Sequence, residues 1–93
     1  MVIGAMCCEL LIGGSRSLKE KKRVIRGLMA RTRNRFNVAV AEVDHQDIWN
    51  RAQIGIVCVS NDAGHAHSML EAVARMFDSS PDVVLCSYEI EIL

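Results

Sequence analysis

The sequence predicts an α+β fold in which two helices cover one face of a four-stranded antiparallel sheet. Four runs rich in β-branched and aliphatic residues alternate with two segments of helical periodicity, in the order β-α-β-β-α-β. Two β-α-β units joined by a hairpin produce this arrangement. The chain has 93 residues, enough for one hydrophobic core and too few for two. We therefore expect residues 1–93 to form a single domain.

The first part of the chain predicts a strand, a turn and a long helix. Residues 2–12 are β-branched and aliphatic, and they end at Gly13-Gly14, a pair typical of a tight turn. Ser17 and Glu20 predict a capping box, in which the Ser17 hydroxyl accepts the Glu20 amide and the Glu20 carboxylate accepts the Ser17 amide. A helix over about 18–35 follows, because its apolar residues share one arc of the helix surface.

The second part predicts a hairpin, a second helix and a last strand. Residues 37–43 and 53–60 are the hairpin strands, joined by a loop over 44–50. Residues 60–62, Ser-Asn-Asp, offer N-caps to a helix that ends before Pro81. The alternating residues from 83 to 93 form the last strand. The complete order is that of a ferredoxin-like sandwich.

Both helices predict their core residues by the spacing of apolar side chains. These residues are Ile25, Leu28, Met29, Met69, Leu70, Val73 and Phe77.

The sheet face without helices predicts a homodimer. By alternation it carries both aliphatic and acidic residues, and a half-apolar exposed face, like a free strand edge, favours self-association. The residues expected on this face are Cys7, Glu9, Val38, Val40, Glu42, Ser87 and Glu89.

The composition excludes a disordered chain, since 51% of the residues are hydrophobic and only one is proline. Eleven basic and eleven acidic residues cancel, but they are unevenly distributed. Between Ser15 and Phe36 lie nine basic residues against Glu20 alone, a net charge of +8. The rest of the chain holds two basic residues against ten carboxylates, a net charge of −8. This asymmetry indicates a binding site on the basic segment.

The basic residues of the first helix predict an interface with an anionic partner, RNA or the ribosome. A solvated helix face usually mixes charges of both signs, whereas these side chains repel one another at a cost in stability. Regularly spaced cations match a phosphate backbone. An acidic protein surface, including that of a dimer mate, is the alternative partner. Lys21 falls within the apolar arc, where we expect its ammonium to reach outward to solvent. The predicted nucleic-acid-binding residues are Arg16, Lys19, Lys22, Arg23, Arg26 and Arg33.

The glycine turn before this helix is a second candidate site. Free amides and the helix dipole favour an anion there, so Gly14 and Ser15 are candidate ligands of a phosphate. The spacing of a P-loop is absent, and a plain strand-to-helix turn explains the same residues.

The hairpin loop carries the side chains that an enzyme would use. His45 lies beside Asp44 and Asp47, an arrangement that suits a general base with an orienting carboxylate. Loop architecture is the favoured explanation, with the aspartates capping turn amides and Trp49 covering the end of the core, and a polar contact surface is another. No nucleophile lies nearby in the sequence, so we expect a non-catalytic protein. A small phosphate-handling enzyme is the alternative.

The sequence predicts neither a metal nor a cofactor. His65 and His67 are two residues apart, which on a helix turns them away from each other. The four cysteines lie in apolar runs without a CxxC pair, which favours buried, reduced thiols in the cytoplasm. The apolar start of the chain contains Glu9 and is too short to span a bilayer, so we expect no membrane segment and no signal peptide.

Four stretches of the chain closely resemble the YlxP-like family of small bacterial proteins. They are Ser-Leu-Lys-Glu-Lys-Lys-Arg-Val at 17–24, Arg-Asn-Arg-Phe-Asn-Val-Ala-Val-Ala-Glu-Val-Asp at 33–44, Trp-Asn-Arg-Ala-Gln-Ile-Gly-Ile at 49–56, and Val-Ser-Asn at 59–61. The resemblance implies a ferredoxin-like fold, a cytoplasmic location and an unknown function. Genes of this family often lie among those for translation initiation and ribosome maturation, which suggests a link to translation. The family offers no catalytic residues to carry over.

Overall fold

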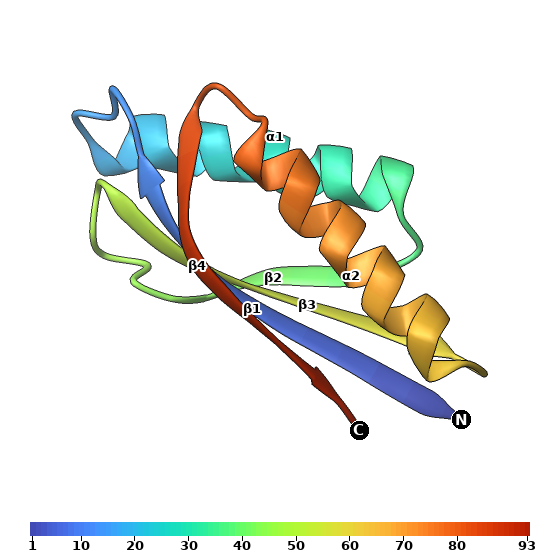
Figure 1. Ribbon diagram of the computed structural model, residues 1–93. Coiled ribbons are helices and arrows are strands. Elements are labelled where there is room, and N and C mark those ends of the chain that lie inside the picture. The colour runs from blue at the N-terminus through green and yellow to red at the C-terminus, as the bar shows by residue number, and fades with distance from the viewer.

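The computed structural model describes residues 1–93 and confirms the predicted order of elements. Its strands and helices are β1 (Val2–Ile12), α1 (Leu18–Arg35), β2 (Ala39–Asp44), β3 (Arg51–Ser60), α2 (Ala63–Asp78) and β4 (Val83–Ile92). The four strands form one antiparallel sheet in the order β2-β3-β1-β4, and both helices lie on the same side of it (Figure 1). The fold is therefore an α+β sandwich of the ferredoxin-like kind.

The helix ends form where the sequence predicts them, with one change at the start of α1. The Ser17 hydroxyl accepts the amide of Glu20 at 3.1 Å, as expected. The Glu20 carboxylate, however, accepts the amide of Arg16 at 2.7 Å and not that of Ser17. In α2, Asp62 is the N-cap, and its carboxylate accepts the amide of His65 at 2.7 Å. Both caps satisfy amides that have no partner within their helix.

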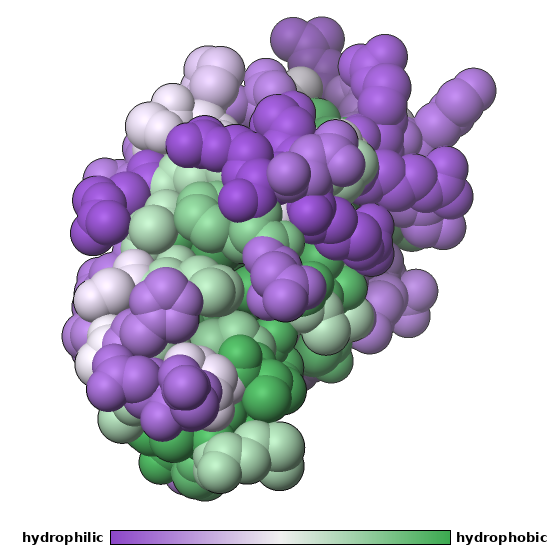
Figure 2. All heavy atoms as spheres, turned by 90° about the vertical axis from the view of Figure 1, so that its right-hand side faces the viewer, coloured by the Kyte–Doolittle hydropathy of each residue, from purple (hydrophilic) through white to green (hydrophobic).

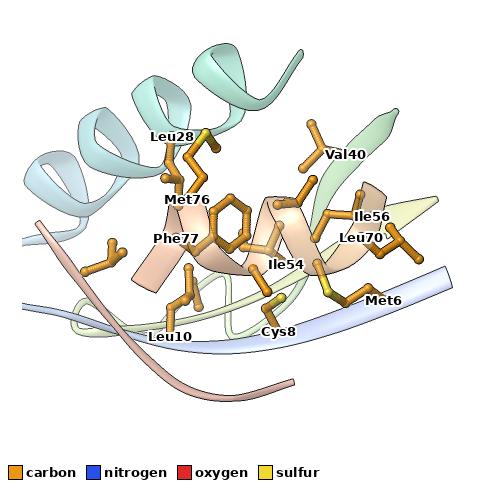
Figure 3. Packing of buried hydrophobic residues seen from close by; sticks show 14 of the residues in the cluster. Met6, Cys8, Leu10, Leu28, Val40, Ile54, Ile56, Leu70, Met76 and Phe77 are labelled. Carbon is orange, nitrogen blue, oxygen red and sulfur yellow. The ribbon is translucent and has the colours of Figure 1, made fainter. Parts of the chain in front are cut away.

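The core lies between the helices and the sheet. The ring of Phe77 is at its centre, between Leu28 of α1 and the side chains of β1 and β3 (Figure 3). Five of the predicted core residues are buried, and the other two, Met29 and Met69, are partly buried against the cluster. The five are Ile25, Leu28, Leu70, Val73 and Phe77.

The prediction for the uncovered sheet face was right for β1 and β4 and wrong for β2. We call this face, which points away from the helices, the outer face. Val40 and Glu42 lie opposite Ile56 and Ile54, two buried residues of β3, so their side chains face the helices, and Val38 also packs against the core. Because neighbouring residues of a strand alternate between faces, β2 presents Ala39, Ala41 and Val43 on the outer face.

The two helices make different contacts with the sheet. α2 packs against β1, β3 and β4, whereas α1 packs chiefly against the short edge strand β2. α1 therefore leaves a broad part of its surface to solvent, and this part carries the basic side chains. Neither helix is long and apolar enough to cross a membrane.

Candidate functional site

The six basic residues predicted as the binding site all have exposed side chains. Lys19, Lys22, Arg23 and Arg26 lie together and, with Glu20, surround one shallow hollow on the solvent side of α1. We call these four residues the basic face of α1. Figure 2 shows hydrophilic side chains gathered at the top of the molecule, the level of α1 in Figure 1. Arg16 precedes the helix, and Arg33 lies outside the hollow, where its guanidinium donates to the Val40 carbonyl at 3.3 Å.

The four cations of the basic face form no ion pair. Of the nine basic residues between Ser15 and Phe36, only Lys21 forms an ion pair. The four cations of the basic face are three or four residues apart, the spacing at which helical side chains are neighbours. Like charges at this spacing destabilise a helix by about 0.2–0.5 kcal/mol per pair. The solvent side of α1 therefore carries a concentrated positive charge, which the single carboxylate of Glu20 offsets only in part.

The prediction that the Lys21 ammonium reaches solvent was wrong. Its side chain is only 1% exposed, and its Nζ donates to the carbonyl of His45 at 2.6 Å. The same Nζ lies 2.9 Å from Oε2 of Glu42, whose side chain is 18% exposed. The ammonium finds these partners because Glu42 faces the helices and His45 has a left-handed backbone, with φ of 66°. Lys21 thus fastens α1 to the end of β2 and takes no part in the exposed surface.

The predicted anion-binding turn is partly occupied by protein contacts. Gly14 is exposed, with a φ of 75° that favours glycine. Ser15 is buried, and its hydroxyl is within hydrogen-bond distance of the Trp49 carbonyl at 2.9 Å and the Ser17 carbonyl at 3.1 Å. The Glu20 carboxylate already accepts the amide of Arg16. The Ser15 side chain holds the turn against the hairpin, and the role of this turn as a phosphate site stays a prediction.

The imidazole of His45 lies closer to Glu9 than to the aspartates of its own loop. Its Nε2 is 3.4 Å from Oε2 of Glu9, while its Nδ1 is 4.0 Å from Oδ1 of Asp44. Glu9 also lies 3.7 Å from Arg51 and accepts a hydrogen bond from Gln53 at 2.8 Å. Sequence reasoning missed Glu9 as a neighbour because it lies on β1, and only the sheet brings it beside the loop.

Two other side chains of the loop are exposed. Asp47 makes no side-chain hydrogen bond or ion pair, and Trp49 is 49% exposed and lies outside the core cluster. The prediction that Trp49 covers the end of the core was therefore wrong. The imidazole of His45 faces the Glu9 carboxylate, and it lines none of the four main hollows of the molecule.

The surroundings of Cys7 and Cys8 disfavour a reactive thiolate. All four cysteines are free; Cys8 and Cys58 are buried, but Cys7 and Cys86 are exposed, contrary to the expectation that all are buried. Burial raises the pKa of Cys8 from 9.0 to about 12. Partial burial and the neighbouring carboxylates of Glu9, Glu89 and Asp44 raise the pKa of Cys7. Both shifts favour the thiol over the nucleophilic thiolate. No three His, Cys, Asp or Glu side chains are grouped to hold a metal ion.

The comparison with known proteins agrees with the family that the sequence motifs suggest. Residues 3–90 match the family described as "Protein of unknown function (DUF503)". The chain belongs to this family. The matched range begins within β1 and ends within β4, so it includes both helices.

One relative of this chain is the uncharacterized protein YlxP of Bacillus subtilis (strain 168). It is 37% identical over 82 residues, which cover 88% of this chain and 89% of the relative. The resemblance to YlxP-like proteins is thereby confirmed. A more distant likeness is to the structure of SnoaB, a cofactor-independent oxygenase from Streptomyces nogalater. It has a TM-score of 0.49 and 12% identity, covering 98% of this chain and 90% of that one. At that distance no chemistry carries over.

Proposed function

We propose that this protein is a non-catalytic, cytoplasmic RNA-binding protein that contacts the structured RNA of the ribosome through α1. One observation carries the proposal. The solvent side of α1 presents a cluster of lysines and arginines without a single ion pair to a carboxylate of the same chain. The gene neighbourhood implied by the resemblance to YlxP-like proteins supports translation as the context.

Structured RNA suits this surface because the contacts are with charge and not with bases. Lysine and arginine on phosphate oxygens fix the position of a protein on a nucleic acid without reading its sequence. The sheet offers no stacking platform, since its strands carry a single aromatic residue, Tyr88, whose hydroxyl donates to Glu71 of α2. RNA would therefore meet the helix and not the sheet, with Arg16 and Arg33 extending the contact at either end.

Co-sedimentation with ribosomes and with isolated ribosomal RNA, over a series of salt concentrations, tests the proposal. The test variant is Lys22→Ala/Arg23→Ala/Arg26→Ala, called here the helix variant. All three side chains are exposed, so the fold is kept. The matched control is Arg51→Ala/Arg75→Ala, which removes exposed cations from outside α1. Three lost phosphate contacts should lower the slope of log affinity against log salt by about 2 to 3.

The expected result is salt-sensitive co-sedimentation of the wild type and the control, with weaker binding and a flatter slope for the helix variant. The RNA proposal is wrong if the wild type fails to co-sediment at low salt. It is equally wrong if the helix variant binds with the same affinity and slope as the wild type.

The absence of catalysis is part of the proposal and has its own test. An enzyme built on His45 and the glycine turn would lose all turnover in His45→Ala, whereas an RNA-binding protein would keep its affinity. Phosphatase, phosphodiesterase and nuclease assays of the wild type and His45→Ala make the comparison. A turnover that disappears with the imidazole would replace the proposal with the phosphate-handling alternative.

A further inference from the structure

The outer face of the sheet has an apolar centre with an acidic rim. A shallow hollow there is lined by Ala5, Cys7, Val43 and Val57, with the carboxylates of β4 at its side. These carboxylates belong to Glu89, opposite Cys7, and to Glu91, opposite Ala5. Nothing else in the chain covers this face, because both helices lie on the other side of the sheet (Figure 1).

The acidic residues of the outer face act on a common point. Glu9, Glu89 and Asp44 come from three different strands, and all three raise the pKa of the Cys7 thiol, after the effect of partial burial. Glu89 and Glu91 make no ion pair and no side-chain hydrogen bond within the chain. The outer face thus holds unpaired negative charge, as the basic face of α1 holds unpaired positive charge.

The basic face of α1 and the outer face of the sheet complement each other in charge and in the apolar surface that each offers. Lysine and arginine have long apolar stems that cover hydrophobic surface while their charged heads reach outward. Laid over the hollow, such stems would contact Ala5, Val43 and Val57, and their heads would reach Glu89 and Glu91. The net charges also match, since the segment from Ser15 to Phe36 carries +8 and the rest of the chain −8.

We propose that the outer sheet face of one copy binds the basic face of α1 of a second copy, so that the protein self-associates head to tail. The basic face and the outer face lie on opposite sides of the molecule (Figure 1). In a two-fold dimer both subunits use the same patch. Because the two surfaces lie on opposite sides of the molecule, no single patch contains both, and their contact is head to tail. Repeating the head-to-tail contact adds further molecules, until the chain closes into a ring or a molecule with only one competent surface ends it.

A back-to-back pairing of two outer faces is disfavoured by the same charges. It would bring Glu89 and Glu91 of one copy against the acidic face of the other. Like charges placed directly across an interface oppose binding. The head-to-tail contact instead places each acidic face against cations. This inference goes beyond RNA binding, and it implies that RNA and a second copy compete for the same helix.

Complementation between two half-active variants tests the contact without any RNA. The helix variant keeps the acidic face and lacks most of the basic face. The sheet variant, Glu89→Gln/Glu91→Gln, keeps the basic face and lacks the two unpaired carboxylates. Sedimentation velocity at low salt measures the size of each variant, of the wild type and of an equimolar mixture of the variants.

The wild type should grow in mass with concentration at low salt and return to one chain at high salt, because the contact is ionic. Each variant alone should associate at least about tenfold more weakly than the wild type. Their mixture should recover association and stop at one copy of each, since a single competent pair of surfaces remains. Recovery of association by mixing is the result that a loss of folding in either variant would not produce.

Three results would overturn the inference. A wild type that stays monomeric at low salt excludes self-association, and binding of a poly-lysine peptide to that monomer would make the acidic face a site for a foreign basic segment. A helix variant that associates as strongly as the wild type would indicate a two-fold contact through the sheet face or a strand edge. A mixture no larger than its components would exclude the complementary pair. Failure of RNA binding alone would leave the inference standing, since no RNA enters the test.

Discussion

At the scale of single residues, Lys21 differs from the other cations of α1, because its ammonium is buried and paired whereas theirs are exposed and form no ion pair. Lys21 sits among apolar side chains of α1, and its cost of burial is offset by the Glu42 carboxylate and the His45 carbonyl. The contact with Glu42 is an ion pair without good hydrogen-bond alignment, and Oε2 has no other polar partner. Each of the two charges therefore depends on the other.

Lys21→Met should destabilise the fold by about 3 kcal/mol, since it leaves a carboxylate and a carbonyl without their donor. This value is at the low end of the range for a buried pair, because Glu42 is 18% exposed and gains some hydration. Urea unfolding of Lys21→Met measures the loss. The double variant Lys21→Met/Glu42→Leu should recover most of it. Equal instability of the single and double variants would contradict the pairing.

The buried thiol of Cys8 predicts a fall in stability at alkaline pH. Burial raises its pKa in the folded protein to about 12, against 9.0 for an ordinary cysteine. Between these values the unfolded chain loses the proton and the folded chain keeps it. The free energy of unfolding should therefore fall by about 1.4 kcal/mol per pH unit above pH 9, and Cys8 should contribute no pH dependence below it.

Unfolding of the wild type and Cys8→Ala, compared between pH 8 and pH 11, measures this contribution. Other groups titrate in the same range in both proteins, so the difference between the two curves isolates Cys8. The difference should shrink as pH rises. Parallel curves would show that the thiol titrates alike in the folded and unfolded chains.

At the scale of elements, the periodicity of the chain predicted the helices and strands well, because each amphipathic segment carries its own pattern. The caps at Ser17 and Asp62 and the apolar arcs of both helices are local properties, so the sequence alone reveals them. The face of β2 was not predictable in this way. Its alternation is clear, but which set faces the helices depends on its register with β3.

The candidate site also has a part that the sequence predicts and a part that it does not. The exposed basic face follows from helical periodicity, and in the structure its four residues surround one hollow. The contacts of Lys21 with Glu42 and of His45 with Glu9 join different elements, and no local pattern reveals them. Sequence reasoning therefore found the surface that solvent sees and missed the pairs that tertiary structure creates.

The basic face of α1 predicts that removing it makes the protein more stable. The helix variant eliminates four like-charge pairs: Lys19 with Lys22 and Arg23, and Arg26 with Lys22 and Arg23. At about 0.2–0.5 kcal/mol each, their loss should raise the free energy of unfolding by about 1 to 2 kcal/mol at low salt. The gain should shrink at high salt because screening already weakens the repulsion in the wild type.

Chemical denaturation of the helix variant and the wild type at low and high salt measures this gain, at protein concentrations low enough to exclude association. A gain in stability together with a loss of RNA binding would identify the repulsion as a cost retained for function. A helix variant less stable than the wild type would indicate that these side chains contribute to packing.

At the scale of the whole molecule, the helix that carries the cations, α1, is also the less tightly packed of the two helices. α2 is packed against three strands, while α1 rests chiefly on β2, a short strand at the edge of the sheet. α1 also carries the repelling cations and Gly27, and glycine within a helix costs about 1 kcal/mol relative to alanine. We therefore expect β1, β3 and α2 to form the most stable part of the fold.

Amide hydrogen exchange should reveal this gradient. Regions open with free energies that depend on their buried contacts, so the least packed element exchanges first. We expect the amides of α1 to exchange faster than those of β1, β3 and α2 in the free protein at low concentration. A short structured RNA at low salt should slow exchange selectively in α1, because a ligand that binds only the folded helix opposes its opening. The control is the helix variant, in which the RNA should give little protection while the free helix exchanges more slowly than in the wild type. Exchange from α1 as slow as from the central strands would contradict the gradient, and protection centred on β4 would move the RNA contact away from the helix.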